Sequence, residues 1–185
     1  VIVGGGVHHS GAENEVARLQ MVAGVPVATT NMGKGVVDES QPLSIGVVGN
    51  SMGTRAPAKF LREYIQGADV ILFAGTRTNE NGTSGWSLFP AAATYIQIDI
   101  DPEELGRNYP ALRLLGDAKE SLAALNTAIE KLPATGLAAR TKQIEQVIAQ
   151  ARAKHAQESA APPDTPPGLL HPETVVHALA TTRDQ

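Results

Sequence analysis

The sequence predicts an α/β fold in which a parallel sheet of five or six strands is flanked by helices. Short apolar runs, each the length of a strand, alternate along the chain with longer amphipathic segments. Glycine-containing turns follow several of these runs, as at Gly4-Gly5-Gly6 and Gly75-Thr76-Arg77. Such an alternation requires parallel strands joined by right-handed crossovers. A chain of 185 residues corresponds to one domain, with or without appendages.

Six segments are candidate strands, because they are short, apolar and enriched in β-branched residues. They are residues 1–3, 26–29, 43–48, 70–74, 94–100 and 113–115. The clearest is Val-Ile-Leu-Phe-Ala at 70–74, between Asp69 and Gly75. The carboxyl ends of parallel strands meet at one edge of the sheet, which is where sheets of this type bind ligands.

The segments between the strands carry helical patterns with recognisable ends. Ser10, with Glu13 three residues later, predicts a capping box for a helix that Gly24 ends. Asp101 and Pro102 predict the cap and first position of a short helical turn. Helices are also expected at residues 55–66 and 118–131, and loops at 31–41 and 78–93.

The chain changes character after Pro133. Residues 136–158 have sparse apolar positions and predict a solvated surface helix, whereas residues 160–168 contain four prolines and predict an extended linker. The sequence starts inside an apolar strand pattern without an initiator Met, so we expect a piece of a longer protein. Three parts are expected: a central domain truncated at its N-terminus (1–132), a surface helix with a Pro-rich interdomain linker (133–170), and the start of a following domain (171–185).

Composition excludes several classes of site and partner. The absence of cysteine excludes disulfides, thiolate catalysis and thiolate metal sites, and fits the reducing cytoplasm, which is the expected location. The net charge of -4, without a basic cluster, argues against a nucleic-acid partner. No apolar run approaches the ~20 residues of a membrane span, so no membrane partner is expected.

The glycines after the first strand do not form a dinucleotide fingerprint. Gly-x-Gly-x-x-Gly would need glycine at position 9, which is His9. Gly4, Gly5 and Gly6 still allow the main chain to approach a phosphate or a ring, although a tight turn without a ligand is the alternative. His8 and His9 have no metal or acid–base partner at a recognised spacing, so we interpret them as polar residues at a loop edge.

Charged residues follow three of the candidate strands. Arg77 follows residues 70–74 within Gly75-Thr76-Arg77, and its fork suits a phosphate or diphosphate; an ion pair with an acidic neighbour such as Glu80 is the alternative. Asp99 lies at the end of the next strand, where a carboxylate typically accepts hydrogen bonds from ribose hydroxyls. Asp117 repeats this placement, with capping of the next helix as its alternative. No catalytic constellation is apparent in the sequence.

The order and spacing of these motifs resemble the central domain of thiamine-diphosphate-dependent enzymes of the acetolactate synthase and pyruvate decarboxylase superfamily. The resemblance covers about residues 1–132, and its motifs are specific only in combination. They are Gly4-Gly5-Gly6, residues 24–30, Met32-Gly33-Lys34-Gly35, Asp38-Glu39, Pro42-Leu43, Gly46, Gly49, residues 68–72, Gly75-Thr76-Arg77, residues 98–102 and Gly116-Asp117-Ala118. The tail from Leu170 resembles the start of the family's diphosphate-binding third domain.

The resemblance implies a three-layer Rossmann-like sheet of six parallel strands between two catalytic domains. Family members hold FAD, ADP or nothing in this domain. Carried over by position, the residues that would approach the phosphates and the ribityl or ribose part are Gly4, Gly5, Gly6, Thr29, Thr30 and Met32. Arg77 would meet a phosphate, and Asp99, Ile100 and Asp117 would meet the adenosine end. The His8-His9 pair and residues 78–86 depart from the pattern of FAD-using members, which leaves ADP, CoA or no nucleotide open.

The resemblance also implies where thiamine binds. The family builds the thiamine site from its first and third domains, so we expect thiamine diphosphate and Mg²⁺ only in the full-length parent and no turnover by the isolated chain. The parent is expected to act on 2-keto acids, or on an acyl-CoA relative. Its expected partners are flanking thiamine-binding domains of the same chain, assembled as a homodimer or homotetramer.

Two further readings stay open from the sequence. The first is a free-standing NAD-dependent enzyme. The broken fingerprint argues against a dehydrogenase, and a sirtuin-like deacylase would need zinc-binding cysteines that the chain lacks. The second is a non-catalytic scaffold, whose glycines serve only tight turns and whose sheet faces serve interdomain packing.

Overall fold

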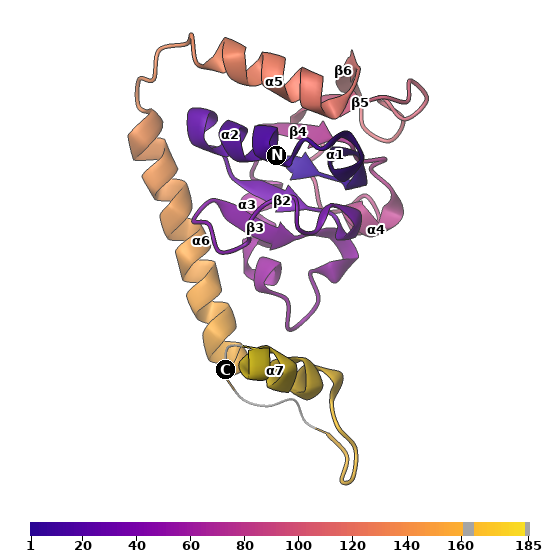
Figure 1. The fold of residues 1–185 in the computed structure, drawn as a ribbon, viewed down its shortest axis with the longest axis vertical. Coiled ribbons are helices and arrows are strands. Elements are labelled where there is room, and N and C mark those ends of the chain that lie inside the picture. The colour runs from indigo at the N-terminus through magenta and orange to yellow at the C-terminus, as the bar shows by residue number, and fades with distance from the viewer. Residues whose placement is uncertain (161–164, 184–185) are drawn as a thin grey trace.

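The computed structural model describes residues 1–160 and 165–183, and its fold is shown in Figure 1. Within these residues the sheet has six strands, all parallel, in the order β3-β2-β1-β4-β5-β6. The strands are β1 (Ile2–Val3), β2 (Val27–Thr29), β3 (Ser44–Val47), β4 (Val70–Ala74), β5 (Thr94–Asp99) and β6 (Ala111–Leu115). This is the doubly wound order of Rossmann folds, which confirms the predicted fold class.

Helices cover both faces of the sheet and complete three layers (Figure 1). The helices of the described residues are α1 (Gly5–Ser10), α2 (Glu13–Ala23), α3 (Arg62–Gln66), α4 (Glu80–Thr83), α5 (Ala118–Ile129), α6 (Leu137–Ser159) and α7 (Pro172–Arg183), with 3₁₀ turns η1 (Asn31–Gly33), η2 (Gly49–Ser51) and η3 (Pro57–Leu61). Of these, α7 lies beyond the sheet (Figure 1). Successive side chains of a strand point to opposite faces. Leu72 and Ala74 of β4 therefore share a core with α2 and α5, whereas Ile71 and Phe73 share the other core with η3, α3 and α6.

An aromatic cluster fills the second core next to β4 and β5. The Phe73 ring stacks on Tyr95 with 5.6 Å between centroids and meets Phe89 edge-on at 5.2 Å. Tyr109 lies 4.7 Å from Tyr95. Burial raises the pKa of Tyr95 to about 12, and its hydroxyl donates to the Pro90 carbonyl oxygen at 2.6 Å. These contacts pack β4 and β5 against two connections: the loop before β5, which carries Phe89, and the turns after it, which carry Tyr109.

The first helix begins earlier than predicted. Gly5 and Gly6 are the first residues of α1 and not a free turn. Ser10 ends this helix and its hydroxyl donates to the Val7 carbonyl oxygen at 3.2 Å, so it is not available to cap α2. The N-cap of α2 is Ala12, which has no side-chain cap. The predicted capping box of Ser10 and Glu13 is therefore wrong.

Several other segments differ in detail from the prediction. Residues 55–66 form η3 followed by α3, and the loop at 78–93 contains α4, whose Asn79 side chain accepts a hydrogen bond from the Gly82 amide at 3.0 Å. The last strand begins at Ala111 rather than 113. The Asp101 carboxylate accepts from the Glu103 amide at 2.9 Å as a cap would, but residues 102–106 form turns and no helix.

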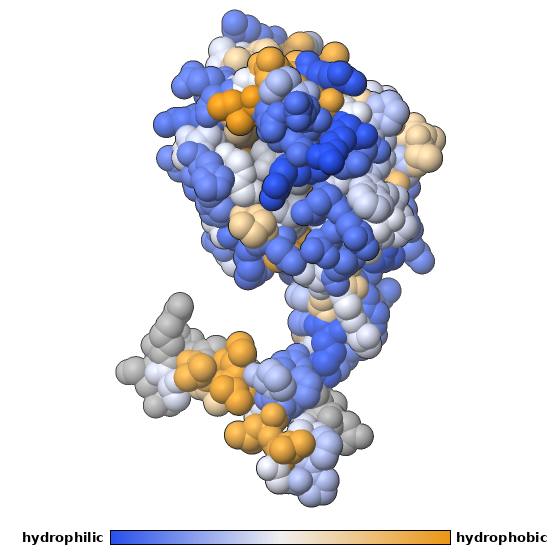
Figure 2. Space-filling model, turned by 90° about the vertical axis from the view of Figure 1, so that its right-hand side faces the viewer, coloured by the Kyte–Doolittle hydropathy of each residue, from blue (hydrophilic) through white to orange (hydrophobic). Residues whose placement is uncertain are grey.

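The C-terminal segments lie along and beyond one side of the domain (Figure 1). Ile148 and Ala151 of α6 are buried in the same core as η3, so this predicted surface helix is docked on one face. The linker predicted at 160–168 falls partly on residues 161–164, which lie outside the described residues, as do residues 184–185. Exposed apolar side chains gather around α7 (Figure 2); they are Leu169, Leu170, Val175, Val176 and Leu179. The division into three parts stays a prediction.

Candidate functional site at the carboxyl edge of the sheet

The predicted site residues follow five neighbouring strands at one edge of the sheet. From β2 through β1, β4 and β5 to β6, each strand ends directly before one group of them. The chain leaves β1 toward β2 on one side, and β4 lies on the other side, so the order reverses between β1 and β4. Open α/β sheets bind ligands in the crevice at such a switch point. The topology therefore brings the predicted residues into one row.

The glycines at the switch point permit close contact between main chains. The Gly4 amide donates to the Ala74 carbonyl oxygen at 3.0 Å, and the Gly6 amide donates to that of Gly75 at 2.9 Å. A Cβ on Gly4 would lie 2.6 Å from the Cβ of Thr76, and one on Gly6 would lie 2.7 Å from the Cα of Gly75. Their first role is thus to let the segments after β1 and β4 touch.

The segment after β2 lies against the same place. The Thr30 amide donates to the Val3 carbonyl oxygen at 2.9 Å, and a Cβ on Gly5 would lie 3.3 Å from that of Met32. The Thr29 side chain is fully buried, and its hydroxyl has no hydrogen-bond partner among the residues that the structure describes. Met32 is 72% exposed. A ligand on this edge would therefore meet Met32 before either threonine.

Arg77 is an exposed cation at the end of β4. Among the described residues it forms no ion pair with Glu80 or with any other acidic side chain, so that alternative is wrong. Asn108 holds the loop that carries Arg77, because its side-chain amide donates to the carbonyl oxygens of Arg77 and Thr78 at 3.3 and 3.1 Å. The position of the backbone is thus fixed while the guanidinium is left accessible to an anion.

The residues at the ends of β5 and β6 already bind main-chain groups. One carboxylate oxygen of Asp99 accepts from the Asp101 amide at 3.0 Å. Asp117 caps α5, which is the alternative role predicted for it, and its carboxylate accepts from the amides of Lys119 and Glu120 at 2.8 and 3.2 Å. In the described part of the chain, the second carboxylate oxygen of each aspartate accepts no hydrogen bond. Ile100 is 73% exposed.

Two residues that hold the site loops are missing from the sequence-based prediction. Gln97 is buried in β5, where its amide donates to the Thr76 carbonyl oxygen at 3.3 Å and its oxygen accepts from the Gly106 amide at 2.9 Å. The Asn108 side-chain amide likewise donates to the carbonyl oxygens of Arg77 and Thr78, which follow Thr76. A glutamine at an inward-facing strand position signals a buried polar tether. Nothing in the sequence around Asn108 marks its role.

His8 is bonded on both sides of its ring. Nδ1 lies 2.8 Å from a carboxylate oxygen of Glu13 and Nε2 lies 3.1 Å from the Lys34 carbonyl oxygen. The hydrogen bond to Glu13, the bond to Lys34 and the negative charge of Glu13 raise the pKa of His8, which the small loss of hydration opposes. His8 is thus a connection between α1, α2 and the segment after η1, not only a polar loop residue as predicted. His9 is exposed.

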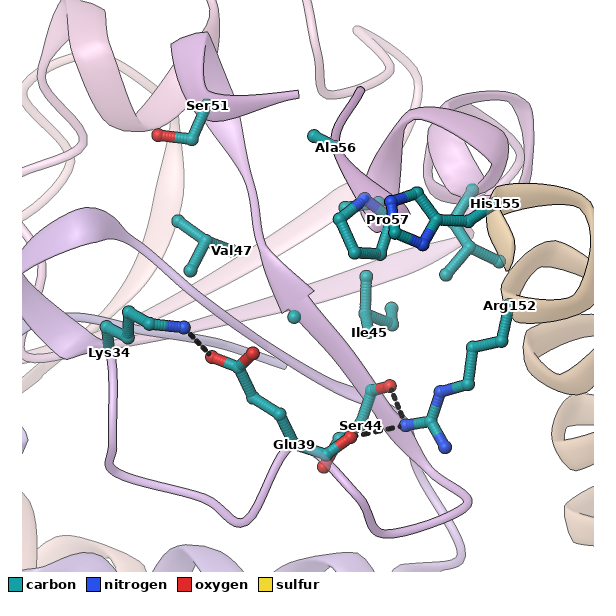
Figure 3. A pocket seen from close by; sticks show the side chains of 13 residues that line it. Lys34, Glu39, Ser44, Ile45, Val47, Ser51, Ala56, Pro57, Arg152 and His155 are labelled. Atoms are coloured by element: carbon teal, nitrogen blue, oxygen red, sulfur yellow. Dashed lines mark hydrogen bonds and ion pairs between the residues drawn. The ribbon is translucent and has the colours of Figure 1, made fainter. Parts of the chain in front are cut away.

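Two cavities are lined by residues outside this row. One of about 350 Å³ is bordered by β3, η3, α6 and the segment before β3 (Figure 3). Among its polar side chains, Lys34 pairs with Glu39 at 2.6 Å, and Arg152 donates to the Ser44 carbonyl oxygen at 2.9 Å (Figure 3). The other, of about 620 Å³, is largely apolar and lies at the amino ends of β1 and β4. None of the predicted site residues lines either cavity.

Metal and membrane features are limited to what the described residues show. Residues 1–160 and 165–183 contain no group of three His, Cys, Asp or Glu side chains placed to hold a metal ion. None of the helices that the structure describes is both long and apolar enough to cross a membrane.

The chain matches a family model described as "Thiamine pyrophosphate enzyme, central domain" over residues 1–125. It is 40% identical over 130 residues to the "Probable acetolactate synthase large subunit" of Methanocaldococcus jannaschii, which covers 70% of this chain and 21% of that protein. It is 37% identical over 121 residues to the "Acetolactate synthase" of Arthrospira platensis, covering 65% and 21%. The chain thus spans about a fifth of the length of these relatives.

A solved structure supports the fold alone. It is an X-ray structure assigned to a thiamin diphosphate-dependent enzyme from Mycobacterium smegmatis, with a TM-score of 0.54 and 18% sequence identity. The match covers 68% of this chain and 24% of that one.

Proposed function

This chain belongs to the thiamine pyrophosphate enzymes as a central domain of the acetolactate synthase-like kind, and on that premise we propose that the carboxyl edge of its sheet binds FAD or ADP. The free-standing NAD-dependent enzyme has no support from this family membership. The nucleotide would lie along the row of residues that follow β2, β1, β4, β5 and β6. Its phosphates would lie nearest the switch point.

One observation carries the proposal: three main-chain segments meet at the switch point with a free cation beside them. Gly4 and Gly6 contact Gly75, and Met32 lies beside Gly5. Arg77 follows directly after Gly75 and is exposed. A guanidinium next to this close-packed main chain suits a diphosphate, which it can bind through two parallel hydrogen bonds.

The rest of the row suits an extended ligand. Neighbouring strands lie ~4.8 Å apart, so the row from β2 to β6 is on the order of 19 Å long. Met32 and Ile100 present exposed apolar surface on either side of Arg77. The second carboxylate oxygens of Asp99 and Asp117 would accept hydrogen bonds from ribose hydroxyls at the β5 and β6 end of the row. These features fit the residues that the family resemblance assigns to a nucleotide.

The parent enzyme would use thiamine diphosphate and Mg²⁺ to decarboxylate a 2-keto acid and transfer the resulting carbanion equivalent. The cofactor supplies that chemistry. In this proposal the present domain joins the two thiamine-binding domains of a homodimeric or homotetrameric cytoplasmic protein. Its bound nucleotide would assist structure rather than the reaction.

The proposal is tested by measuring which nucleotide the purified chain binds. We expect FAD or ADP to bind in titration calorimetry, and Arg77→Ala to weaken binding by about tenfold or more, because a charge-assisted bond to phosphate is lost. Arg18→Ala is the matched control, since Arg18 lies on α2 and pairs with Glu130 on α5 at 2.8 Å. Absence of binding by FAD, ADP and CoA would reject the proposal.

A second candidate is a purely architectural domain. The observation that favours it is that the amides of Gly4 and Gly6 are already bonded to carbonyl oxygens, and that main chain fills the space a Cβ would take. Close packing thus explains these glycines without a ligand. An empty protein in the calorimetric test would support this reading.

A further inference from the structure

The segment that carries Met32 is held to the first βα unit at three points. The Thr30 amide is bonded to Val3 at the end of β1, and Met32 lies beside Gly5 at the start of α1. The third point is His8, whose Nε2 lies 3.1 Å from the Lys34 carbonyl oxygen. His8 is three residues after Gly5, so both lie on the same face of α1. His8 is thus the side-chain attachment at the Lys34 end of the segment, between Gly33, which lies against Val3 and Gly4, and Val36, which is buried in the same core as Val7.

The two partners of the His8 ring are both hydrogen-bond acceptors. Nδ1 faces a carboxylate oxygen of Glu13 at 2.8 Å, and Nε2 faces the Lys34 carbonyl oxygen. A neutral imidazole has one N–H and one lone pair, whereas the imidazolium has two N–H donors. Both contacts can therefore be hydrogen bonds only when His8 carries a proton on each nitrogen.

We propose that His8 is a positioning residue which, when protonated, fixes the Lys34 end of the Met32 segment against α1 and, when neutral, releases that end. The proposal concerns the position of this segment, and it rests on the proposed function only for the nucleotide that Met32 would then contact. Nothing in the family motifs requires a histidine here, because the His8-His9 pair is a departure from them.

The surrounding charges decide which contact is lost. Glu13 on α2 keeps the remaining proton on Nδ1, because a bond to a carboxylate is stronger than one to a carbonyl. The Lys34 ammonium is turned away to Glu39, 2.6 Å distant, and Lys119 of α5 acts on Glu13. On deprotonation the lone pair on Nε2 then faces the Lys34 oxygen, and that contact opens. The bond to Glu13 raises the pKa of His8, which brings the change toward neutral pH.

An NMR pH titration of the whole chain tests the proposal without any ligand. The Met32 methyl resonance should shift with the same midpoint as the His8 ring, and the neutral ring should carry its proton on Nδ1. His8→Gln should abolish the Met32 titration, whereas His9→Gln, the neighbouring exposed histidine, should leave it unchanged. Glu13→Gln should lower the midpoint of both signals together, since the main cause of the raised pKa is removed.

A Met32 methyl that does not move through the His8 titration, in a folded protein, would overturn the proposal. So would a neutral ring protonated on Nε2. If the chain also binds ADP or FAD, affinity should fall by about two- to tenfold as His8 deprotonates, in the wild type and not in His8→Gln. A chain that binds no nucleotide but keeps the coupled titration would refute the proposed function and leave this inference standing.

Discussion

At Gly4 the segment after β1 is in close contact with the segment after β4. Gly4 lies directly after β1, and its amide bonds to the last residue of β4. A Cβ at this position would overlap the Gly75 carbonyl oxygen and the side chain of Thr76. Because Gly75 is main chain and Thr76 is buried, neither can move without displacing the loop that carries Arg77.

Gly4→Ala should therefore lower the free energy of unfolding by about 1–3 kcal/mol, the usual cost of overpacking. The matched control is Gly53→Ala, because a Cβ there meets nothing within 4 Å and the backbone angle is not left-handed. Urea unfolding of the two variants and the parent chain gives the comparison. Equal stability of all three would show that the loop after β4 yields easily.

His8 should make stability depend on pH in a defined direction. Its pKa is raised by the bond to Glu13, so its contribution is complete below the unfolded value of about 6.5 and is lost as pH rises through the folded value. The pKa of Glu13 is lowered by its own backbone amide and by His8, so its contribution is present above about 4.3 and is lost as pH falls through the lower folded value.

The thermal midpoint of His8→Gln should accordingly lie furthest below that of the wild type near pH 5.5, and the two should converge toward about pH 9. Scans at several pH values by circular dichroism measure this difference, with His9→Gln as the control. The side chain is 38% exposed, so the effect is expected to be small. A gap that widens toward high pH would have the wrong sign for this explanation.

At the scale of elements, Arg152 adds a polar clamp between α6 and the edge of the sheet to the buried contacts of Ile148 and Ala151. The Arg152 guanidinium donates to the carbonyl oxygens of Glu39, Gln41 and Ser44 at 2.6, 2.7 and 2.9 Å, and to that of Ser40 at 3.1 Å. Figure 3 shows this side chain reaching from α6 to the segment before β3. The bonds tie a helix to a loop that has no strand partner of its own.

Arg152→Ala should lower the free energy of unfolding by about 1–3 kcal/mol, because several charge-assisted bonds are lost together. Arg152→Lys should recover only part of this loss, since an ammonium cannot form the same fork. Lys154→Ala on the exposed side of α6 should change stability by about 0.5 kcal/mol or less. Urea unfolding ranks the three, and an Arg152→Ala as stable as Lys154→Ala would contradict the clamp.

The elements that could be predicted from sequence are those whose own residues determine them. Residues 70–74 are apolar and bounded by turn residues, and they form β4 as predicted. Ser10 has the residue type of a cap but ends α1, because the helix begins at Gly5, where long-range bonds to Ala74 and Gly75 hold the backbone. Local propensity carries no information about such bonds.

The candidate site was predictable in the same uneven way. Every residue that follows a strand could be placed at the carboxyl edge, because the alternation of strands and helices fixes that edge. The tethers that shape it could not, since the side-chain amides of Gln97 and Asn108 donate to carbonyl oxygens of Thr76 and Arg77, 21 and 31 residues away in sequence. The double bonding of His8 depends likewise on Lys34, 26 residues later.

At the scale of the whole molecule, the part of the chain that matches its acetolactate synthase relatives covers about a fifth of their length. The family resemblance places the thiamine site between the first and third domains, with the present domain between them. The apolar side chains around α7 are exposed in this chain, as expected of a segment that packs against further protein (Figure 2). Under the proposed function, the activity of the parent enzyme and part of the packing of α7 would depend on the domains that flank this one.

The isolated chain should therefore bind no thiamine diphosphate, with or without Mg²⁺, and should release no CO₂ from 2-keto acids. Titration calorimetry with thiamine diphosphate measures the first, and a decarboxylation assay measures the second. The longer parent protein, measured in the same buffers, is the control and should bind thiamine diphosphate and show turnover. Since the row of residues proposed to bind the nucleotide lies wholly within this chain, ADP or FAD should bind the isolated chain and the parent alike. Saturable thiamine binding by residues 1–185 alone would mean that the cofactor site is not shared between flanking domains in this protein.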